Sequence, residues 1–280
     1  MCFKQLLIIF IMASCVRIAR KYLVPNRDVT IRMLQVSIIL PVYNSEHYLN
    51  STLVSILQQT MPNFELIALD DCSTDQSLQI LQDWAQRDNR IRIAANEQNL
   101  GVADTRNKGI ALAKGAYICF VDSDDIWHSD KLERQLNFMK QSCCDFSCTA
   151  YAMVDDEREF MKNRFIGKRQ IVLEDLLKEN YICCSTVMLK AELAKQYSMN
   201  GSYAHEDFVY WLDLLQNGAN GMVLDETLVQ YRVAQSGRSA NKGKAAQGRW
   251  QIYRKHLHYG VVKSARYFMH YTINGIKKYS

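Results

Sequence analysis

The chain has 280 residues, of which 48% are hydrophobic and 22% are charged, with only 12 glycines and 3 prolines. This composition is typical of a folded globular protein and excludes a disordered or collagen-like chain. The mean hydropathy of −0.21 argues against several membrane spans, because each span needs about 20 consecutive apolar residues.

Charge is divided unevenly along the chain behind its net value of +5. Residues 37–226 carry a net charge of −11, whereas residues 227–280 carry 11 lysines and arginines and no aspartate or glutamate. Such a basic block is typical of a surface that meets an anionic partner, either membrane phosphate or nucleic acid. The acidic main part of the chain argues against nucleic acid as that partner.

Residues 1–33 form a predicted N-terminal extension. Its apolar run, Leu6–Met12, is too short to span a bilayer. With Lys4 before it and Arg17 after it, the run imitates a signal peptide, but no small-residue cleavage pattern follows. The alternative is that Met33 is the true start, just before the first predicted strand.

The nine cysteines are odd in number and lack CxxC spacing, and four of them form two adjacent pairs. Neither a disulfide framework nor a zinc site has this spacing. We therefore expect reduced, mostly buried thiols in a reducing compartment. This indicates a cytoplasmic protein, with a peripheral position on the inner face of the plasma membrane as the alternative.

Strands and helices are predicted to alternate from residue 36 to residue 121, in units of about 30 residues. This order is typical of a parallel sheet with right-handed crossovers, a Rossmann-like architecture of the α/β class. The predicted strands are Val36–Leu40, Phe64–Leu69, Ile91–Ala94 and Ala116–Val121, and the predicted helices are Ser45–Gln58, Asp75–Arg87 and Gly101–Ala113.

Beyond residue 130 the alternation is less regular. The predicted helices are Lys131–Gln141, Leu173–Glu179, Glu206–Gln216, Lys242–His258 and Val261–Lys278. The predicted strands are Asp145–Met153 and Met161–Val172 around a turn at Asp155-Asp156, then Ser185–Leu189 and Val229–Val233.

Three of the predicted strands end in polar clusters, at residues 41–44, 70–75 and 122–125. In open α/β sheets ligands bind at the carboxyl ends of strands, so these clusters should meet in one crevice. Two of them are crowded with carboxylates, which repel one another unless a cation is present. A hard divalent metal suits oxygen ligands of this kind, whereas the alternative is that these residues are only turns and helix caps.

Glycine-rich phosphate loops are absent from the sequence. No GxGxxG follows the first strand, and no GxxxxGK[ST] occurs anywhere. The sequence therefore argues against dinucleotide oxidoreductases and P-loop enzymes.

Five segments of the sequence carry a resemblance to a known family. The segments VSIILPVYNSEHYL, LIALDDCSTDQS and NLGVADTRNKGIALAKGAYICFVDSDD resemble the family-2 inverting glycosyltransferases of the GT-A fold. HEDFVYWLDLL resembles their Glu-Asp motif on the acceptor side, and QYRVAQSGRSANK resembles the closing segment of bacterial surface-polysaccharide members. The resemblance implies a GT-A domain at residues 34–240, with a mostly parallel sheet and flanking helices, followed by a basic helical tail at 241–280.

The resemblance implies a nucleotide-sugar site at the strand ends. Asp71 would accept a hydrogen bond from a uracil N–H, with Asp70 as the less favoured partner. Asp124 would coordinate Mn²⁺ or Mg²⁺, which bridges the diphosphate. Asp125 would cap a helix or support its neighbours. The remaining residues implied to bind the nucleotide sugar are Pro41, Tyr43, Asn44, Arg106, Asp122 and Ser123.

The same resemblance places the acceptor chemistry at Glu206 and Asp207. Asp207 is the candidate general base that takes the proton of the acceptor hydroxyl, and Glu206 would orient it or bind the acceptor. The alternative is that both are first-turn acidic residues favoured by the helix dipole. His205 is expected to be structural, with a contact to the leaving phosphate as the alternative.

Cations and aromatic residues follow the last predicted strand. Arg232, Arg238 and Lys242 would either be solvated or close over the diphosphate, since charge-assisted contacts to phosphate favour arginine. Residues 241–280 suit a contact with an anionic membrane surface, with packing on the catalytic domain as the alternative. The aromatic residues of this segment are Trp250, Tyr253, Tyr259, Tyr267, Phe268 and Tyr271.

These motifs together predict a metal-dependent inverting hexosyltransferase or N-acetylhexosaminyltransferase. It would move a sugar from a UDP-sugar to a glycan or lipid-linked glycan in O-antigen, capsule or lipooligosaccharide synthesis. The alternatives are a metal-dependent nucleotidyltransferase, whose glycine-rich first loop is lacking, and a non-catalytic nucleotide-sugar-binding protein. A phosphatase of the haloacid-dehalogenase type is disfavoured because Ile126 stands where that class has threonine.

Overall fold

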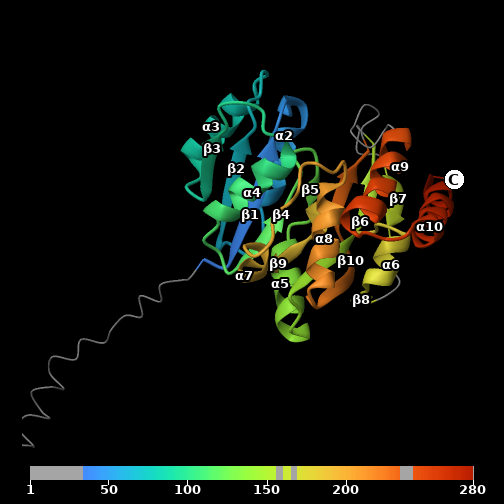
Figure 1. Ribbon diagram of the computed structural model, residues 1–280. Helices are drawn as coiled ribbons and strands as arrows, with labels where there is room; N and C mark the ends of the chain where they lie inside the picture. The colour runs from blue at the N-terminus through green and yellow to red at the C-terminus, as the bar shows by residue number, and fades with distance from the viewer. Residues whose placement is uncertain (1–33, 156–159, 165–168, 234–241, 280) are drawn as a thin grey trace, which may run out of the picture. The chain divides into compact units, whose positions relative to one another are not determined.

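The structure is a computed structural model, and it describes residues 34–155, 160–164, 169–233 and 242–279 (Figure 1). The predicted extension at residues 1–33 lies outside these ranges, as do Asp156 of the predicted turn and Arg238. The described part from Leu34 onward belongs to one compact unit.

One mixed sheet forms the centre of the described chain. Its strands are β1 (Val36–Val42), β2 (Phe64–Asp70), β3 (Ile91–Ala95), β4 (Tyr117–Phe120), β5 (Ile126–Trp127), β6 (Phe146–Val154), β7 (Phe160–Arg164), β8 (Gln170–Ile171), β9 (Met188–Lys190) and β10 (Gly221–Arg232). They lie in the order β3-β2-β1-β4-β9-β6-β10-β5, with β7 beside β6 and β8 beside β10.

Most of the long strands run in the same direction. β1 pairs in parallel with β2 and β4, β2 with β3, and β6 with β10. The short strand β9 is antiparallel to both of its neighbours, β4 and β6, so these two point the same way. The predicted mostly parallel sheet is confirmed, and the carboxyl ends of its main strands lie at one edge.

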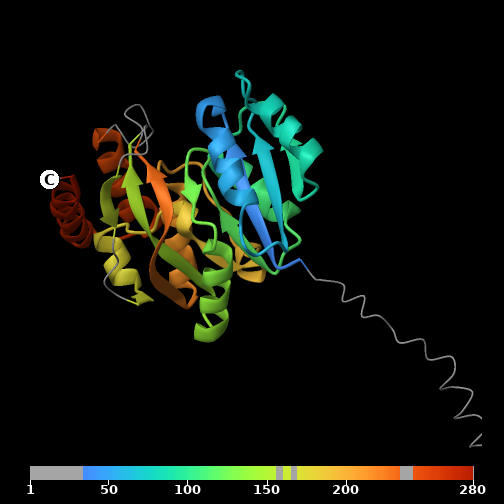
Figure 2. The same ribbon diagram turned by 180° about the vertical axis from the view of Figure 1, so that it is seen from behind.

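Helices cover both faces of this sheet, as Figures 1 and 2 show from opposite sides. One face carries α2 (Glu46–Leu57), α3 (Ser77–Arg87) and α5 (Lys131–Ser142), and the other carries α4 (Val102–Leu112), α6 (Leu173–Lys178), α7 (Ala191–Ala194) and α8 (Glu206–Gln216). Alternation along β1 serves both layers, because Ile38 and Leu40 join the core under α2 whereas Ile39 joins the core under α4.

The second half of the sheet differs from the prediction in several places, and the short strand β5 was not predicted at all. β10 begins at Gly221, eight residues before the predicted strand, because Asp225 and Glu226 interrupt its apolar pattern. The strand passes these two residues through register shifts against β6, which keep the pairing on both sides. The predicted strand Met161–Val172 is divided into β7 and β8, and the predicted Ser185–Leu189 becomes a 3₁₀ turn (Cys184–Thr186) followed by β9.

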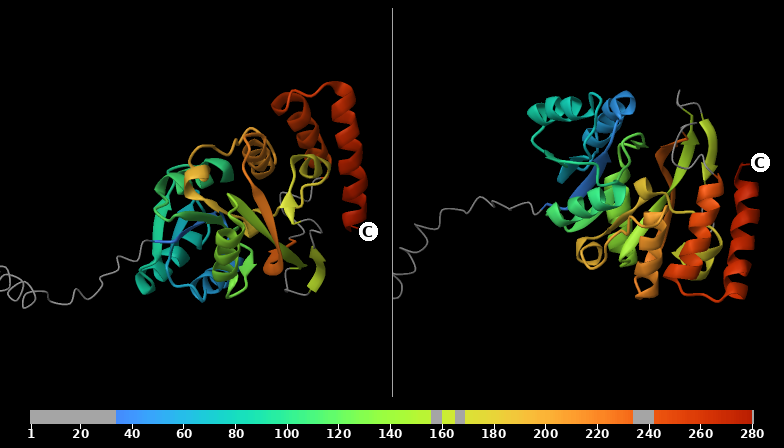
Figure 3. Two further views of the ribbon diagram at one scale, coloured as in Figure 1. Left: turned by 90° about the horizontal axis from the view of Figure 1, so that it is seen from below. Right: turned by 45° about the horizontal axis from the view of Figure 1, so that its top comes forward.

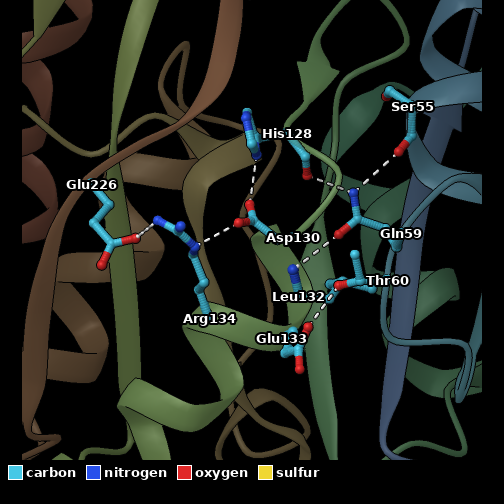
Figure 4. A network of polar contacts seen from close by, with 9 residues as sticks. All are labelled: Ser55, Gln59, Thr60, His128, Asp130, Leu132, Glu133, Arg134 and Glu226. Atoms are coloured by element: carbon cyan, nitrogen blue, oxygen red, sulfur yellow. Dashed lines mark hydrogen bonds and ion pairs between the residues drawn. The ribbon is translucent and has the colours of Figure 1, made fainter.

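A polar network fastens the end of α2 to the start of α5, as Figure 4 shows. The Gln59 side chain donates to the His128 carbonyl oxygen at 2.7 Å and accepts from the Leu132 N–H at 3.0 Å. Arg134 pairs with Asp130 at 2.6 Å and with Glu226 of β10 at 2.5 Å. These contacts fix the segment that leaves the carboxylate cluster at residues 122–125.

Lys131, the first residue of α5, is fully buried. Its Nζ donates to Gln135 Oε1 at 2.7 Å and lies 4.1 Å from the centroid of the Trp127 ring. Burial disfavours the charged ammonium and lowers the pKa of Lys131 to about 8.

The lowered pKa of Lys131 predicts that the free energy of unfolding rises with pH. Above about pH 8 the folded chain releases the Lys131 proton while the unfolded chain, with a pKa of about 10.4, still holds it. The unfolded state then binds more protons, so the free energy of unfolding of wild type should rise relative to Lys131→Met by about 1 kcal/mol per pH unit. Urea unfolding of both proteins at about pH 7, 8 and 9 measures this, with the exposed Lys140→Met as control. Parallel pH curves for wild type and Lys131→Met would contradict it.

The C-terminal helices pack against the rest of this unit. α9 (Lys242–Gln251) continues into a π-helical turn (Ile252–His256), and α10 (Val261–Tyr279) follows beside α6 and α9. Ile252 and Tyr253 are fully buried, and the Tyr253 hydroxyl donates to the Leu177 carbonyl oxygen at 2.6 Å. The segment predicted as a tail therefore contributes side chains to the core, so the predicted boundary at residue 240 does not divide the compact unit.

No helix within the described ranges is long and apolar enough to cross a bilayer.

Candidate active site

The ends of β1 and β2 are tied together through the first two predicted polar clusters. Asn44 adopts the left-handed conformation (φ 48°), which turns the chain sharply after β1. Its Oδ1 accepts from the Thr74 N–H at 2.8 Å, and its own N–H donates to Ser73 Oγ at 3.0 Å. Pro41 lies within β1, and Tyr43 at its end is 51% exposed. The predicted pocket residues thus lie together at the carboxyl edge, with the Tyr43 side chain accessible to a ligand.

Asp71 is buried and its carboxylate orders the loop before α4. Oδ1 accepts from Asn96 Nδ2 and from the Leu100 N–H, both at 2.8 Å, and Oδ2 accepts from the Gly101 N–H at 2.9 Å. Gly101 supplies the positive φ of 84° that this loop needs. Oδ1 of Asp70 is buried and has no hydrogen-bond partner among the described residues. The uracil contact of Asp71 stays a prediction, and Asp70 is the neighbour with an acceptor atom to spare.

Ser185 holds the carboxylate loop that follows β4. Its Oγ accepts from the Asp122 N–H at 3.0 Å and donates to Asp125 Oδ2 at 2.5 Å. Burial, reinforced by the nearby charges of Asp124 and Asp122, holds the pKa of Asp125 well above its usual range. Ser123 joins the same loop to the end of β1, since its Oγ lies 2.6 Å from Ser45 Oγ.

Arg232, at the end of β10, also supports this loop. Its N–H donates to Asp125 Oδ1 at 3.0 Å, and its Nε donates to the Asp124 carbonyl oxygen at 3.2 Å. The guanidinium lies 4.4 Å from the centroid of the Tyr48 ring. These contacts make Arg232 a positioning residue for Asp124, and its contact with a diphosphate stays a prediction. Arg238 and the Lys242 side chain lie outside what the structure describes.

Arg106 joins the two predicted halves of the site. It projects from α4 and is only 1% exposed. Its Nη2 donates to Asp122 Oδ1 at 2.6 Å, and its Nη1 donates to Glu206 Oε1 at 2.9 Å. Burial alone would lower the pKa of Arg106, but neighbouring acidic groups, Asp122 and Glu206 among them, raise it well above its usual range. The predicted nucleotide contact of Arg106 is untested, whereas its bridge between the two carboxylates is a structural finding.

Glu206 and Asp207 occupy the first turn of α8. Glu206 is buried, whereas Asp207 is partly exposed and its Oδ1 accepts from the Phe208 N–H at 2.7 Å. This contact satisfies one of the N–H groups at the helix start that have no partner within the helix. Through Arg106, the start of α8 is placed beside the loop after β4.

The donor set at residues 122–125 fits a divalent metal shared with a substrate. Among the described residues no three His, Cys, Asp or Glu side chains converge on a closed metal site. Asp122 accepts from Arg106 and Asp125 accepts from Ser185, while Asp124 is partly exposed beside them. Mg²⁺ is commonly held by one or two carboxylates together with substrate phosphates, and Mn²⁺ accepts the same oxygen ligands. The assignment of such an ion to Asp124 stays a prediction.

Two contributors to the site were missed from the sequence. Ser185 was expected within a strand, and Arg249 was counted only as part of a basic tail. The Arg249 guanidinium is buried 3.5 Å from the centroid of the Phe208 ring, next to Asp207. Burial lowers the pKa of Arg249. A Cβ at Gly248 would lie 3.1 Å from Ala204 Cβ, so this glycine allows α9 to approach the start of α8 closely. Neither contact has a local sequence signal.

A hollow of about 630 Å³ lies elsewhere, between α2, β5 and β10. Its lining includes Val54, Trp127 and Val229, and none of the predicted site residues. The site is therefore an arrangement of loops at the sheet edge rather than this hollow.

The sheet, its strand-end carboxylates and its flanking helices define the class of GT-A glycosyltransferases. The chain belongs to glycosyl transferase family 2, whose sequence pattern matches residues 37–198. The putative teichuronic acid biosynthesis glycosyltransferase TuaG of Bacillus subtilis is 37% identical over 87% of this chain and 96% of that protein. WfgD of Escherichia coli, a UDP-Glc:alpha-D-GlcNAc-diphosphoundecaprenol beta-1,3-glucosyltransferase, is 32% identical over 88% of this chain and 95% of that protein.

Solved structures share the fold. S. aureus TarS 1–349 in complex with UDP-GlcNAc matches with a TM-score of 0.67 at 23% identity, over 79% of this chain and 64% of that chain. The mannosyltransferase PcManGT from Pyrobaculum calidifontis, in complex with GDP-Man and Mn²⁺, matches with a TM-score of 0.63 at 17% identity, over 84% of this chain and 69% of that chain. The predicted GT-A fold is thus confirmed, and the match to family 2 confirms that the chain is a glycosyltransferase.

Proposed function

We propose that this glycosyltransferase moves a hexose or N-acetylhexosamine from a UDP-sugar to a glycan acceptor carried on a lipid diphosphate, with inversion at the anomeric carbon. Such a step belongs to bacterial surface-polysaccharide synthesis, as in O-antigen, capsule or lipooligosaccharide. Support comes from the named donor and acceptor of WfgD, the UDP-GlcNAc complex of TarS, and the teichuronic acid role in the name of TuaG.

The observation that carries the proposal is the Arg106 bridge. It links Asp122, on the predicted donor side, to Glu206, on the predicted acceptor side, across 100 residues of sequence. A transferase must hold a donor and an acceptor in one geometry, because the two substrates react only when they are oriented together.

The proposed chemistry follows from the carboxylates on the two sides. Tyr43 and Asp71 bind the nucleobase, and Asp122 orients the ribose or the sugar. The acceptor hydroxyl attacks the anomeric carbon, its proton passes to the Asp207 carboxylate, and the sugar–phosphate bond breaks to release UDP. Attack from the face opposite the leaving group inverts the anomeric configuration.

Asp124 would hold Mn²⁺ or Mg²⁺ next to the diphosphate. When bound, the ion supplies positive charge that stabilises the nucleoside diphosphate as it leaves.

Titration with UDP tests this site. UDP is expected to bind wild type at least about tenfold more tightly with Mn²⁺ than without it, and Asp124→Asn is expected to lose that gain. GDP and dTDP are measured in parallel, and the exposed Asp104→Asn is the matched control. Failure of every nucleotide to bind wild type would overturn the proposed donor site.

A further inference from the structure

One face of α10 is apolar and exposed. Ser264 and Tyr267 point into the protein and are buried, whereas Val261, Val262, Met269 and Ile273 are 60%, 86%, 57% and 44% exposed. Half of the eight large apolar side chains that are exposed in the described residues belong to this helix. Apolar side chains are thus concentrated on α10 rather than scattered over the surface.

Val262, Met269 and Ile273 form a stripe on one side of α10 that also carries a cation. They are spaced by seven and four residues, which places them on one side of a helix. The exposed Arg266, four residues after Val262, lies on the same side between Val262 and Met269, and the exposed Lys263 lies at its border. An apolar stripe bordered by cations is typical of helices that lie in the plane of a membrane interface.

Charge decides between a membrane and a second copy of the chain. Residues 227–280 contain no aspartate or glutamate. Pairing of two α10 helices would bring Arg266 and Lys263 of one copy near those of the other, and the nearby carboxylate of Glu174 in α6 already pairs with Lys178 of its own helix. Lipid phosphates supply the missing negative charge, and the acyl boundary accepts Val262, Met269 and Ile273. We infer that this stripe of α10 docks on an anionic lipid surface.

The opposite side of α10 faces the proposed acceptor side. Tyr271, on another side of α10, is 4.9 Å from the Arg249 guanidinium, which in turn lies 3.5 Å from the Phe208 ring next to Asp207. Figure 3 shows α10 as the outermost helix beside α9. Membrane docking rests on the proposed function for its purpose, because an acceptor held in a membrane would then reach Asp207 from the side of α10.

Vesicle binding by the full chain tests this inference. Wild type is expected to float with vesicles of phosphatidylcholine and phosphatidylglycerol, and not with phosphatidylcholine alone. Val262→Gln/Met269→Gln/Ile273→Gln should weaken binding by about tenfold or more, because it removes the apolar contact. Lys263→Gln/Arg266→Gln should weaken vesicle binding by about fivefold for each charge removed. This effect of the double substitution should be smaller at high salt, which screens the charges. The matched controls are Val54→Gln and Lys140→Gln, which remove an exposed apolar residue and an exposed cation from other helices.

Three results would overturn docking through this stripe. Wild type could fail to bind the anionic vesicles, or the triple variant could bind them as tightly as wild type. A dimer of wild type that dissociates in the triple variant would assign the stripe to a second copy instead. UDP titration of the same proteins keeps the two proposals apart. Vesicle binding without UDP binding would overturn the donor site alone, and UDP binding without vesicle binding would overturn docking alone.

Discussion

Asp207→Asn is expected to lower the rate of sugar transfer by about a thousandfold or more while UDP binds with unchanged affinity. An amide cannot take the proton of the acceptor hydroxyl, but its oxygen still accepts from the Phe208 N–H, as Asp207 Oδ1 does at 2.7 Å. The start of α8 should therefore stay folded. Release of UDP from a UDP-sugar in the presence of a lipid-diphosphate acceptor measures transfer, and calorimetric titration measures UDP binding.

Asp104→Asn is the matched control for this experiment. Asp104 also lies in the first turn of a helix and is exposed, so the same chemical change should leave transfer unaltered. Loss of UDP affinity in Asp207→Asn would move Asp207 to the donor side. Transfer at the wild-type rate would remove it from the role of general base.

Arg106→Met is expected to have the second large effect, on both stability and transfer. It removes a buried guanidinium that binds both Asp122 and Glu206, which should lower the free energy of unfolding by about 3–5 kcal/mol. Transfer should fall as well, because the start of α8 is no longer tied to the loop after β4. Urea unfolding and the UDP-release assay measure the two effects.

Two further variants separate the bridge from a general loss of packing. Arg106→Met/Glu206→Gln should regain part of the lost stability, since the buried charge is removed together with its partner. Arg134 also pairs with two carboxylates, but it is half exposed, so Arg134→Met should shift the unfolding midpoint only slightly (Figure 4). An equal decrease in the free energy of unfolding for Arg106→Met and Arg134→Met would show that burial of the Arg106 bridge does not increase its contribution to stability.

The first half of the fold could be predicted because its signals are local. β1, β2 and β3 are short, mostly apolar runs, and each is followed by a helical segment within the next few residues. β10 could only be predicted in part, because Asp225 and Glu226 interrupt its pattern and the strand passes them by register shifts set by β6. The hydrophobic pattern of residues 221–232 carries no information about the neighbouring strand β6.

The candidate site divides in the same way. Asp122, Asp124, Glu206 and Asp207 lie in recognisable motifs, and the structure places the loop after β4 near the start of α8 through Arg106. The bridge itself, the support of Ser185 for the loop and the packing of Arg249 on Phe208 join residues far apart in sequence. Such contacts follow from the packing of the whole chain, which no single segment encodes.

The position of α9 has a consequence for how the protein is made. The site is finished by Gly248 and Arg249, which close against Ala204 and Phe208 from a helix near the end of the chain. During synthesis on the ribosome, the proposed donor side can form early from local strand–helix units, whereas the proposed acceptor side is completed only after α9 emerges. A nascent chain would thus complete the proposed donor side before it completes the proposed acceptor side.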